Sequence, residues 1–309
     1  MSRTISSDQD DVQRYELTNF IWLQDRQSTL DAAASLRRSV EETDYRIAQV
    51  ETLDGWCAVC KKQTIFTVNI GATFNGRPNL REGLRCQHCK LNNRQRLLLL
   101  ALHEEFDARH TNPVGAILES TTRLFRNVHK RWPLIIGSEF LGDSRSPGKI
   151  YGWSTHWWRM RRSRHESITK LSYETNSLDA IVHSDILEHV YQTKLALTES
   201  YRALKKGGVM IFTAPFFIDL DVSVLRGRQL NDGSLERLEP DEYHGDGLHA
   251  GGVYTFHNFG WSFFEAIGEA GFSKVELGLN YAPDKGFTSS DPPTLHQWSM
   301  LPILFRALK

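Results

Sequence analysis

Short apolar runs alternate with helix-spaced apolar positions from about His110 to the end of the chain. Apolar runs bounded by polar or turn residues are typical of buried strands, and helical segments between them indicate a parallel sheet. The pattern therefore predicts an α/β fold. The predicted strands are residues 114–119, 133–139, 178–184, 208–214 and 274–279, with a last strand near the C-terminus at 302–308.

A different pattern precedes this region. Residues 8–50 favour helix: Val12, Tyr15, Phe20 and Leu23 mark one apolar face, and a second run extends from about Thr29 to Val50. Such helices could cap the main domain, close over it as a lid or form a homodimer arm. Residues 55–89 instead predict short strands with turns, and a helix is predicted from about Asn93. The predicted domains are 1–54 (helical), 55–95 (metal ribbon) and 96–309 (α/β).

Composition limits the class of protein. The chain has 309 residues, 40% of them hydrophobic, as expected of a folded globular protein. Lysine plus arginine equals aspartate plus glutamate, 37 against 37, so nucleic-acid binding is not favoured. The polar N-terminal segment and the lack of a long apolar stretch predict a cytoplasmic protein without a membrane span.

Four cysteines form the strongest local motif. Cys57 and Cys60 make one C-x-x-C pair, and Cys86 and Cys89 make another. Two thiolates on a tight turn can occupy adjacent corners of a tetrahedron, so two such turns predict a zinc ribbon. All four cysteines are used, which favours a structural ion; a catalytic zinc would need His88 or His103 as a replacement ligand.

The segment 177–216 resembles the central part of class I S-adenosylmethionine-dependent methyltransferases. Asp179 begins the strand, Leu187-Glu188-His189 opens the next helix, and Gly207-Gly208 turns into the following strand. The motifs R-C-x-x-C-x-L-N-N-R-Q-R, G-S-E-F-L-G and E-Y-H-G-D are similar to a bacterial subgroup of zinc-ribbon methyltransferases. The resemblance implies a Rossmann-like sheet that binds S-adenosylmethionine, with Ser184 and Asp185 facing cofactor and substrate.

The first strand departs from the family pattern because its turn, Glu119-Ser120-Thr121-Thr122, has no glycine. Side chains are expected to replace close backbone approach: Glu119 at the cofactor's ammonium group, with hydroxyls from Ser120 and Thr121. Arg94 and Arg96 are candidates for a carboxylate of the cofactor or substrate, because guanidinium matches two oxygens. Alternatively, both arginines belong to a solvated first helical turn.

The second strand ends in an acidic residue at the place where the ribose hydroxyls are bound in such folds. Glu139 is the residue predicted to accept these hydroxyls, and its neighbours Ser138 and Phe140 are assigned to the same cofactor site. The resemblance also places Glu166 and Ser167 beside the adenine.

A polar segment at residues 240–261 follows the fifth strand, at the edge where this fold accepts substrates. His244 is predicted as the base that takes a proton from the acceptor, because histidine titrates near neutrality. Tyr243 and Asp246 are expected to orient it, and His249 is the reserve base. His189 and His249 are also predicted to contact substrate, and Glu242, His244, Asp246 and His249 could alternatively ligate a metal.

The run from His156 to His165 combines two tryptophans with four arginines. It could plug an edge of the core, contact an acidic or aromatic substrate, or stack on nucleic-acid bases.

Together these features predict a methyltransferase that acts at oxygen or nitrogen of a small molecule or a sugar- or carrier-linked metabolite. Two alternatives remain: intramolecular displacement on the cofactor's own carbon chain, and an inactive zinc-ribbon binding protein.

Overall fold

The computed structural model divides into two compact units, residues 1–110 with 276–304 and residues 111–275 with 305–309. This grouping differs from the predicted segments 1–54, 55–95 and 96–309, because residues 276–304 join the N-terminal ones. No helix in the described part of the chain is long and apolar enough to cross a lipid bilayer. The structure describes residues 4–5, 20–68, 73–74, 77–107, 112–153, 161–230, 232–245, 251–290 and 301–309.

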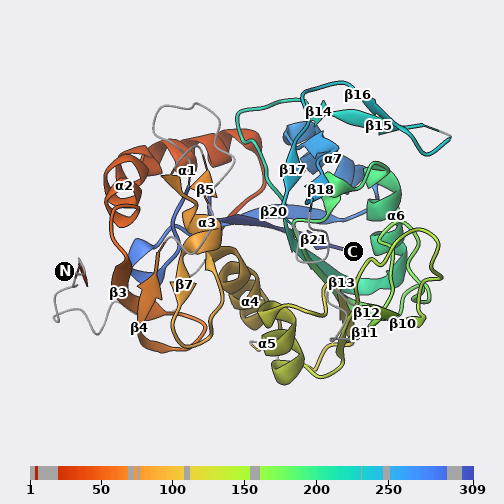
Figure 1. Ribbon diagram of the computed structural model, residues 1–309, viewed down its shortest axis with the longest axis horizontal. Helices are drawn as coiled ribbons and strands as arrows, with labels where there is room; N and C mark the ends of the chain where they lie inside the picture. Colours follow the sequence, from red (N-terminus) through yellow and green to blue (C-terminus); the bar gives the residue numbers. More distant parts are fainter. Residues whose placement is uncertain are drawn as a thin grey trace. The chain divides into compact units, whose positions relative to one another are not determined.

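Parallel strands form the centre of the second unit (Figure 1). β12 (Leu178–Ser184) lies between β13 (Leu204–Thr213) and β8 (Gly115–Ile117), and β8 pairs with β9 (Ile135–Gly137); all three pairings are parallel. β21 (Ile303–Leu308) runs antiparallel to β13. These strands confirm the elements predicted from the apolar runs.

The full strand order is β2-β20-β21-β13-β12-β8-β9, a mixed seven-stranded sheet. β20 (Lys274–Leu279) was also predicted from its apolar pattern and is confirmed. An α/β sheet with this order of strands confirms the predicted Rossmann-like fold class. After the end of β9, Glu139 forms an isolated parallel bridge with His165. This bridge places the residue that follows β11 (Arg161–Arg164) beside the end of β9.

The helical prediction is wrong at residues 20–23. Ile21–Leu23 form strand β2, which pairs antiparallel with Leu277–Leu279 of β20. The side chain of Trp22 lies against Gly278, where an added Cβ would approach the indole within 2.7 Å. A strand is therefore favoured here by β-branched and aromatic residues that pair with a neighbour without a side chain.

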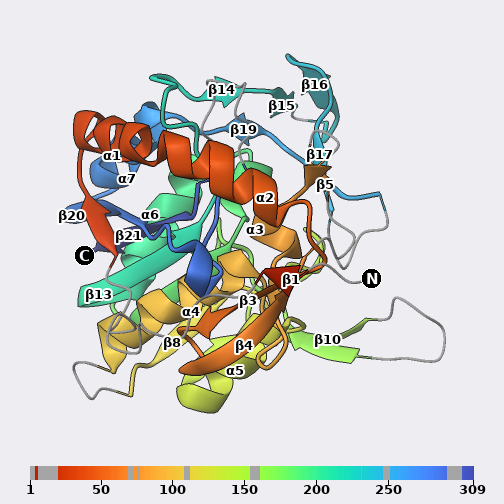
Figure 2. The same cartoon turned by 90° about the vertical axis from the view of Figure 1, so that its left-hand side faces the viewer.

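Helix begins only after Asp25, whose side chain accepts a hydrogen bond from the backbone N–H of Ser28 at 2.9 Å. α1 (Arg26–Ser39) continues through a π-helical turn, η2 (Val40–Asp44), into α2 (Tyr45–Ile47) (Figure 2). The second predicted helical run is thus confirmed. The first, with Val12 and Tyr15, lies outside the described residues.

A small antiparallel sheet carries the cysteines in the first unit. β1 (Thr4–Ile5), β3 (Thr52–Cys57), β4 (Lys62–Thr67) and β7 (Arg85–Cys86) pair in that order. Helix α4 (Asn93–Phe106) follows as predicted, and a capping box between Asn92 and Gln95 starts it. The remaining elements of this unit are β5 (Thr73–Phe74), β6 (Arg77–Pro78), α3 (Leu80–Gly83) and η4 (Pro283–Lys285).

Aromatic side chains fill the core of the second unit. The rings of Phe212 and Phe305 stack with centroids 4.8 Å apart, and Phe216 and Phe263 meet Phe305 edge to face. His183 of β12 stacks on Phe212 at 4.6 Å. The other elements of this unit are α5 (Arg123–Arg131), β10 (Ile150–Trp153), η3 (Leu187–His189), α6 (Thr193–Ala203), β14 (Val224–Leu225), β15 (Gly227–Gln229), β16 (Leu235–Arg237), β17 (Tyr243–His244), β18 (Val253–Tyr254), β19 (His257–Asn258) and α7 (Trp261–Glu269).

Candidate functional site

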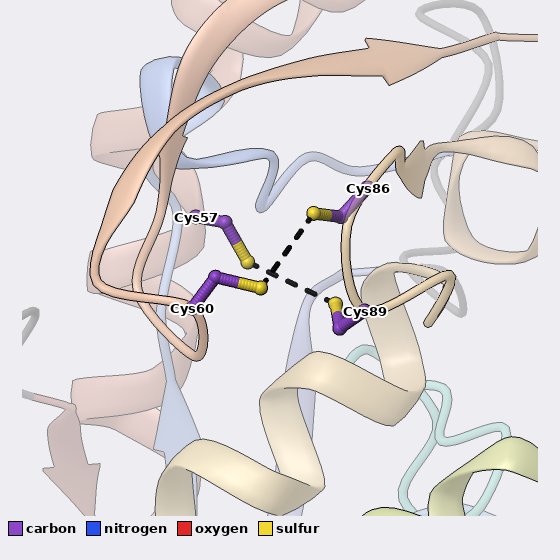
Figure 3. Close-up of side chains that lie close together, drawn as sticks. All are labelled: Cys57, Cys60, Cys86 and Cys89. Atoms are coloured by element: carbon purple, nitrogen blue, oxygen red, sulfur yellow. Dashed lines mark hydrogen bonds between the residues drawn. The ribbon is translucent and has the colours of Figure 1, made fainter.

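The four cysteine side chains of the first unit point toward one another (Figure 3). The Sγ atoms of Cys57 and Cys89 lie 3.9 Å apart, as do those of Cys60 and Cys86. A tetrahedral zinc with Zn–S bonds of about 2.3 Å separates its sulfurs by about 3.8 Å, whereas a disulfide requires about 2.05 Å. The sulfur positions therefore fit one tetrahedral metal ion and no disulfide.

Two matching turns build this cluster. The residue after each C-x-x-C pair is a lysine with positive φ, 53° at Lys61 and 61° at Lys90. Each lysine donates its backbone N–H to the carbonyl of the pair's first cysteine, at 2.7 Å to Cys57 and 2.9 Å to Cys86. The N–H of His88 also points at Cys86 Sγ, 3.3 Å away. Hydrogen bonding from Cys60 lowers the pKa of Cys57 to about 7, while contacts with the other cysteines raise the pKa of Cys60 and Cys89.

Arg96 is fully buried in the first unit. Its guanidinium donates to the carbonyls of Leu84, Leu91 and Gly286 at 2.6–3.0 Å and lies over the ring of Phe66. Burial lowers the pKa of Arg96, while the four cysteines act in the opposite direction. In this geometry Arg96 supports the ribbon and supplies a positive charge near the cysteines, and its contact with a cofactor or substrate carboxylate stays a prediction.

Arg94 also has a partner within the protein, the carboxylate of Glu82. Its Nε and a terminal nitrogen contact the two carboxylate oxygens of Glu82 at 2.6 and 3.0 Å. A bidentate pair of this kind already satisfies the planar fork that a cofactor carboxylate would need. Arg94 therefore holds α3 to α4 in this structure, and its contact with the cofactor stays a prediction.

In the second unit, Glu139 connects the ends of β8 and β9. Its Oε1 accepts the backbone N–H groups of Ser120 and Thr121 at 2.8 and 2.9 Å. A carboxylate that accepts two amides can fix a turn that lacks glycine, because charged hydrogen bonds are about twice as strong as neutral ones. Within the described part of the chain, Oε2 of Glu139 makes no hydrogen bond, which leaves one oxygen for a ligand.

A glycine is still required beside this turn, but it lies on β9. A Cβ added to Gly137 would approach the ring of Phe125 within 2.5 Å and the carbonyl oxygen of Glu119 within 2.9 Å. Close packing of β8, β9 and α5 thus depends on Gly137 rather than on a glycine in the first turn. Glu119 itself is half-buried at the end of β8.

The neighbours of Glu139 differ in accessibility. Ser138 is buried and 1% exposed, whereas Phe140 is 46% exposed and its ring lies 5.6 Å from that of His165. An exposed aromatic ring beside a free carboxylate oxygen can stack on a planar heterocycle. Phe140 therefore suits the predicted cofactor site better than Ser138.

Glu166 makes hydrogen bonds within its own loop, and its place beside the adenine stays a prediction. Its Oε1 accepts from Arg164 Nε at 2.8 Å and from the hydroxyl of Ser172, and its Oε2 accepts the backbone N–H of Ser172 at 2.9 Å. Both oxygens of this buried carboxylate are engaged within the loop, so the side chain has a local structural role. Ser167 is half-buried, and its hydroxyl lies 2.9 Å from that of Thr169.

The end of β12 presents two polar residues together. Asp185 has a positive φ of 50°, and its carboxylate accepts the hydroxyl of Thr213 at 2.8 Å. Ser184 lies opposite Thr213 in the β12–β13 register, with the two hydroxyls 3.2 Å apart. A non-glycine residue held in the left-handed region often marks a functional turn, and this one lies at the carboxyl edge of the parallel strands.

A cluster of acidic and imidazole groups follows it. Oε1 of the buried Glu188 lies 3.8 Å from His189 Nε2 and 3.9 Å from His244 Nδ1. His244 Nε2 lies 3.0 Å from Oε1 of Glu242, whose other oxygen lies 3.2 Å from Arg226. Hydrogen bonding from His244 lowers the pKa of Glu242.

The structure changes the predicted partners of His244. Tyr243 is 51% exposed and packs edge to face on Tyr254. Glu242 makes the contact that was expected from Tyr243. Glu242 lies just before β17, so no strand pattern in the sequence indicated this contact. Asp246 and His249 lie outside the described residues.

Part of the basic and aromatic run lies in β11, which pairs antiparallel with β10. His165 is buried, and its Nδ1 accepts the backbone N–H of Leu141 at 3.0 Å. Burial lowers the pKa of His165, and its Nδ1 is engaged as an acceptor within the fold. Residues 156–160, with both tryptophans of the run, lie outside the described residues.

Comparison with known proteins identifies the second unit. Residues 152–212 match the family model described as a methyltransferase domain. No curated protein matches the chain. The chain therefore contains an S-adenosylmethionine-dependent methyltransferase domain.

Solved structures of methyltransferases also resemble the chain at low identity. One, an S-adenosylmethionine-dependent methyltransferase from Mesorhizobium loti, is 15% identical with a TM-score of 0.42, covering 69% of this chain and 98% of that one. Another, described as a possible histamine N-methyltransferase from Thermotoga maritima, is 14% identical with a TM-score of 0.33, covering 70% and 91%.

Proposed function

We propose that the protein transfers a methyl group from S-adenosylmethionine to oxygen or nitrogen of a small molecule or a sugar- or carrier-linked metabolite. The position of Glu139 carries this proposal. Its carboxylate ends β9 with one oxygen fixed on the amides of Ser120 and Thr121. The other oxygen is the acceptor that a pair of ribose hydroxyls needs.

Several residues would hold the cofactor around Glu139. Phe140 would cover the adenine, while Glu119, Ser120 and Asp185 would face the amino acid part from the ends of β8 and β12. When bound, the cofactor supplies an already activated methyl group, so the protein mainly aligns the acceptor and excludes water. Ser167, Ser184 and Ser138 remain secondary candidates for this site.

His244 is the residue proposed to act on the acceptor. Its Nε2 faces the Glu242 carboxylate at 3.0 Å and donates its proton there, which leaves Nδ1 with a lone pair. A nitrogen oriented in this way can accept a proton from a hydroxyl or amine. His189 and His249 are proposed substrate contacts, with Tyr243 and Asp246 as flanking groups.

The metal of the ribbon is proposed to be zinc in a structural role. Four thiolate ligands complete a tetrahedral shell, so no position is left for substrate. The positive charge of buried Arg96 fits the net negative charge of such a site.

Calorimetric titration with S-adenosylmethionine tests the cofactor proposal. Glu139→Ala should weaken binding by about 1–3 kcal/mol, the cost of losing a buried charged hydrogen bond. Glu139→Gln is the matched control: its amide oxygen can still accept from Ser120 and Thr121, but its NH₂ group cannot accept ribose hydroxyls. Thermal unfolding should therefore be near wild type in Glu139→Gln while cofactor binding is weakened. Tight binding by both variants, or no binding by the wild type, contradicts the proposal.

The product distinguishes methyl transfer from its closest rival. S-adenosylhomocysteine is released by methyl transfer, whereas methylthioadenosine is released by displacement on the cofactor's aminobutyryl chain. Incubation with candidate acceptors followed by mass spectrometry should give S-adenosylhomocysteine.

A further inference from the structure

The two imidazoles of the second unit each have one nitrogen held by an acceptor. His189 Nδ1 lies 2.9 Å from the backbone carbonyl oxygen of Tyr254, and His244 Nε2 lies 3.0 Å from Glu242 Oε1. An acceptor can only be satisfied by an N–H, so these contacts assign the proton to Nδ1 in His189 and to Nε2 in His244. The remaining nitrogens, Nε2 of His189 and Nδ1 of His244, carry lone pairs.

Both lone-pair nitrogens face the same carboxylate. Glu188 has a fully buried side chain, and its Oε1 lies 3.8 Å from His189 Nε2 and 3.9 Å from His244 Nδ1. A carboxylate oxygen and two imidazole nitrogens are ligand types that one transition-metal ion can bind together.

We propose that Glu188, His189 and His244 form a binding site for a divalent transition-metal ion. The three ligand atoms lie within 4.8 Å of one another. Ligands of one ion at about 2.0–2.2 Å are separated by about 3.0–3.6 Å in octahedral or tetrahedral geometry. The separations between ligand atoms must therefore shorten by up to about 1.2 Å for the ion to bind.

The ligand chemistry selects the class of metal. Two imidazoles with one carboxylate suit zinc, iron(II), cobalt(II) or nickel(II), whereas magnesium and calcium prefer oxygen ligands. Three protein ligands leave at least one coordination position open, unlike the four-cysteine site.

Hydrogen bonds with neighbouring groups orient the two histidine rings of the proposed site. A backbone carbonyl holds His189, and a carboxylate holds His244, which is the usual way in which metal-bound histidines are oriented. Arg226 fixes Glu242 from the other side through a contact of 3.2 Å. The backbone N–H of Phe256 donates to the Glu188 carbonyl at 2.8 Å and that of Thr255 to the Glu242 carbonyl at 2.9 Å, so the loop and η3 are tied together.

The role of the ion rests on the proposed methyltransferase function. An open coordination position would take an oxygen of the acceptor, which narrows the acceptor to hydroxyl- or carboxylate-bearing molecules. With the ion bound, His244 is a ligand rather than a base, and the ion itself lowers the pKa of an acceptor hydroxyl. Turnover that requires added metal would indicate that His244 acts as a ligand, and turnover without metal would indicate that it acts as a base.

Cobalt(II) titration of the full-length protein carrying one zinc per chain, held by the four cysteines, tests the site. Zinc in the ribbon is already bound, so cobalt added at one equivalent should produce d–d absorption without the charge-transfer bands of thiolate ligands. His189→Ala and His244→Ala should each weaken cobalt binding at least about 100-fold, since loss of an outer partner alone costs about 10–100-fold. Glu242→Gln should fall within that smaller range.

His129→Ala is the matched control, because this histidine lies on α5 outside the cluster with Nδ1 on the carbonyl of Ile135; it should bind cobalt as the wild type does. Absence of cobalt uptake by the wild type, or equal uptake by all histidine variants, overturns the proposal. S-adenosylmethionine binding is measured on the same samples. Cobalt binding without cofactor binding would refute the proposed function alone, and cofactor binding without cobalt binding would refute the metal site alone.

Discussion

The two ligand clusters of this protein are built in opposite ways. Cys57, Cys60, Cys86 and Cys89 come from two short turns that repeat the same spacing, and each turn presents both of its ligands locally. Glu188, His189 and His244 come from η3 and β17, more than fifty residues apart in the sequence, and only the folding of the second unit brings them together.

The two clusters differ in how many coordination positions of a bound metal ion their protein ligands fill. The cysteine cluster is closed, with a buried guanidinium nearby and four equivalent sulfurs. The histidine cluster has mixed ligands, partly exposed imidazoles and an outer carboxylate. Closed sites of one ligand type hold structure together, and open sites of mixed type leave room for chemistry.

The largest expected effect follows from opening the closed site. Cys86→Ser should abolish zinc retention and remove cooperative unfolding of the first unit, because structural zinc contributes apparent binding energies of about 10–16 kcal/mol in small zinc domains. Zinc content and thermal unfolding measure this. Thr64→Val, which removes only the hydroxyl 3.3 Å from Cys86 Sγ, is the control and should keep its zinc. Full stability of Cys86→Ser without zinc would contradict a structural role.

A smaller effect is expected from the charge beside that site. Arg96→Met should lower the free energy of unfolding by about 3–5 kcal/mol, since three buried carbonyls lose their donor and the thiolates lose a positive neighbour. Chemical denaturation gives the value. Arg94→Met breaks a more exposed pair and should cost about 1 kcal/mol or less. Equal losses in the two variants would show that burial of Arg96 is not what matters.

His183 offers a contrast with the two cluster histidines, because it lies five residues before Glu188 and serves packing only. Burial lowers the pKa of His183 to about 3, so its imidazole stays neutral in the folded protein above that pH. In the unfolded chain the same imidazole takes up a proton below its ordinary pKa of about 6.5. Stability should therefore fall as pH decreases from about 6.5 to about 3, by up to about 1.4 kcal/mol per pH unit.

His183→Phe should remove that part of the pH slope while keeping a ring against Phe212. The free energy of unfolding measured from pH 7 to pH 4 gives the slope, which does not depend on the variant's stability at neutral pH. An unchanged slope would mean that the ring is protonated in the folded state.

The smallest effect concerns the outer carboxylate of the open site. Hydrogen bonding from His244 lowers the pKa of Glu242, so its contribution to stability is present above the ordinary carboxyl pKa and is lost as pH falls through the lowered value. Because the side chain is partly exposed, Glu242→Gln should cost under about 1 kcal/mol at pH 7, and the cost should shrink as the pH is lowered through the acid range. Denaturation across this pH range checks this. A loss that persists at low pH would indicate a packing role instead.

Much of the sheet could be predicted because buried strands have a local signature. The runs around Ile117, Ile181 and Ile211 are apolar on both faces, and all three are central parallel strands. Ile21–Leu23 could not be distinguished from helix by spacing alone, since three residues are too few to tell a period of 2 from one of 3.6. Their strand conformation depends on a partner that lies more than 250 residues further along the chain.

The sequence by itself determined the α/β fold class, the cysteine quartet and the acidic residue at the end of the second strand, because spacing within a turn or along one strand is a local property. Only the tertiary structure showed that Arg94 and Arg96 already have hydrogen-bond partners within the protein. It also showed that Glu139 fixes a turn without glycine, and that Glu242 rather than Tyr243 contacts His244. Those outcomes depend on the few hydrogen bonds that a side chain can make once its neighbours are fixed, and the neighbours come from distant parts of the chain.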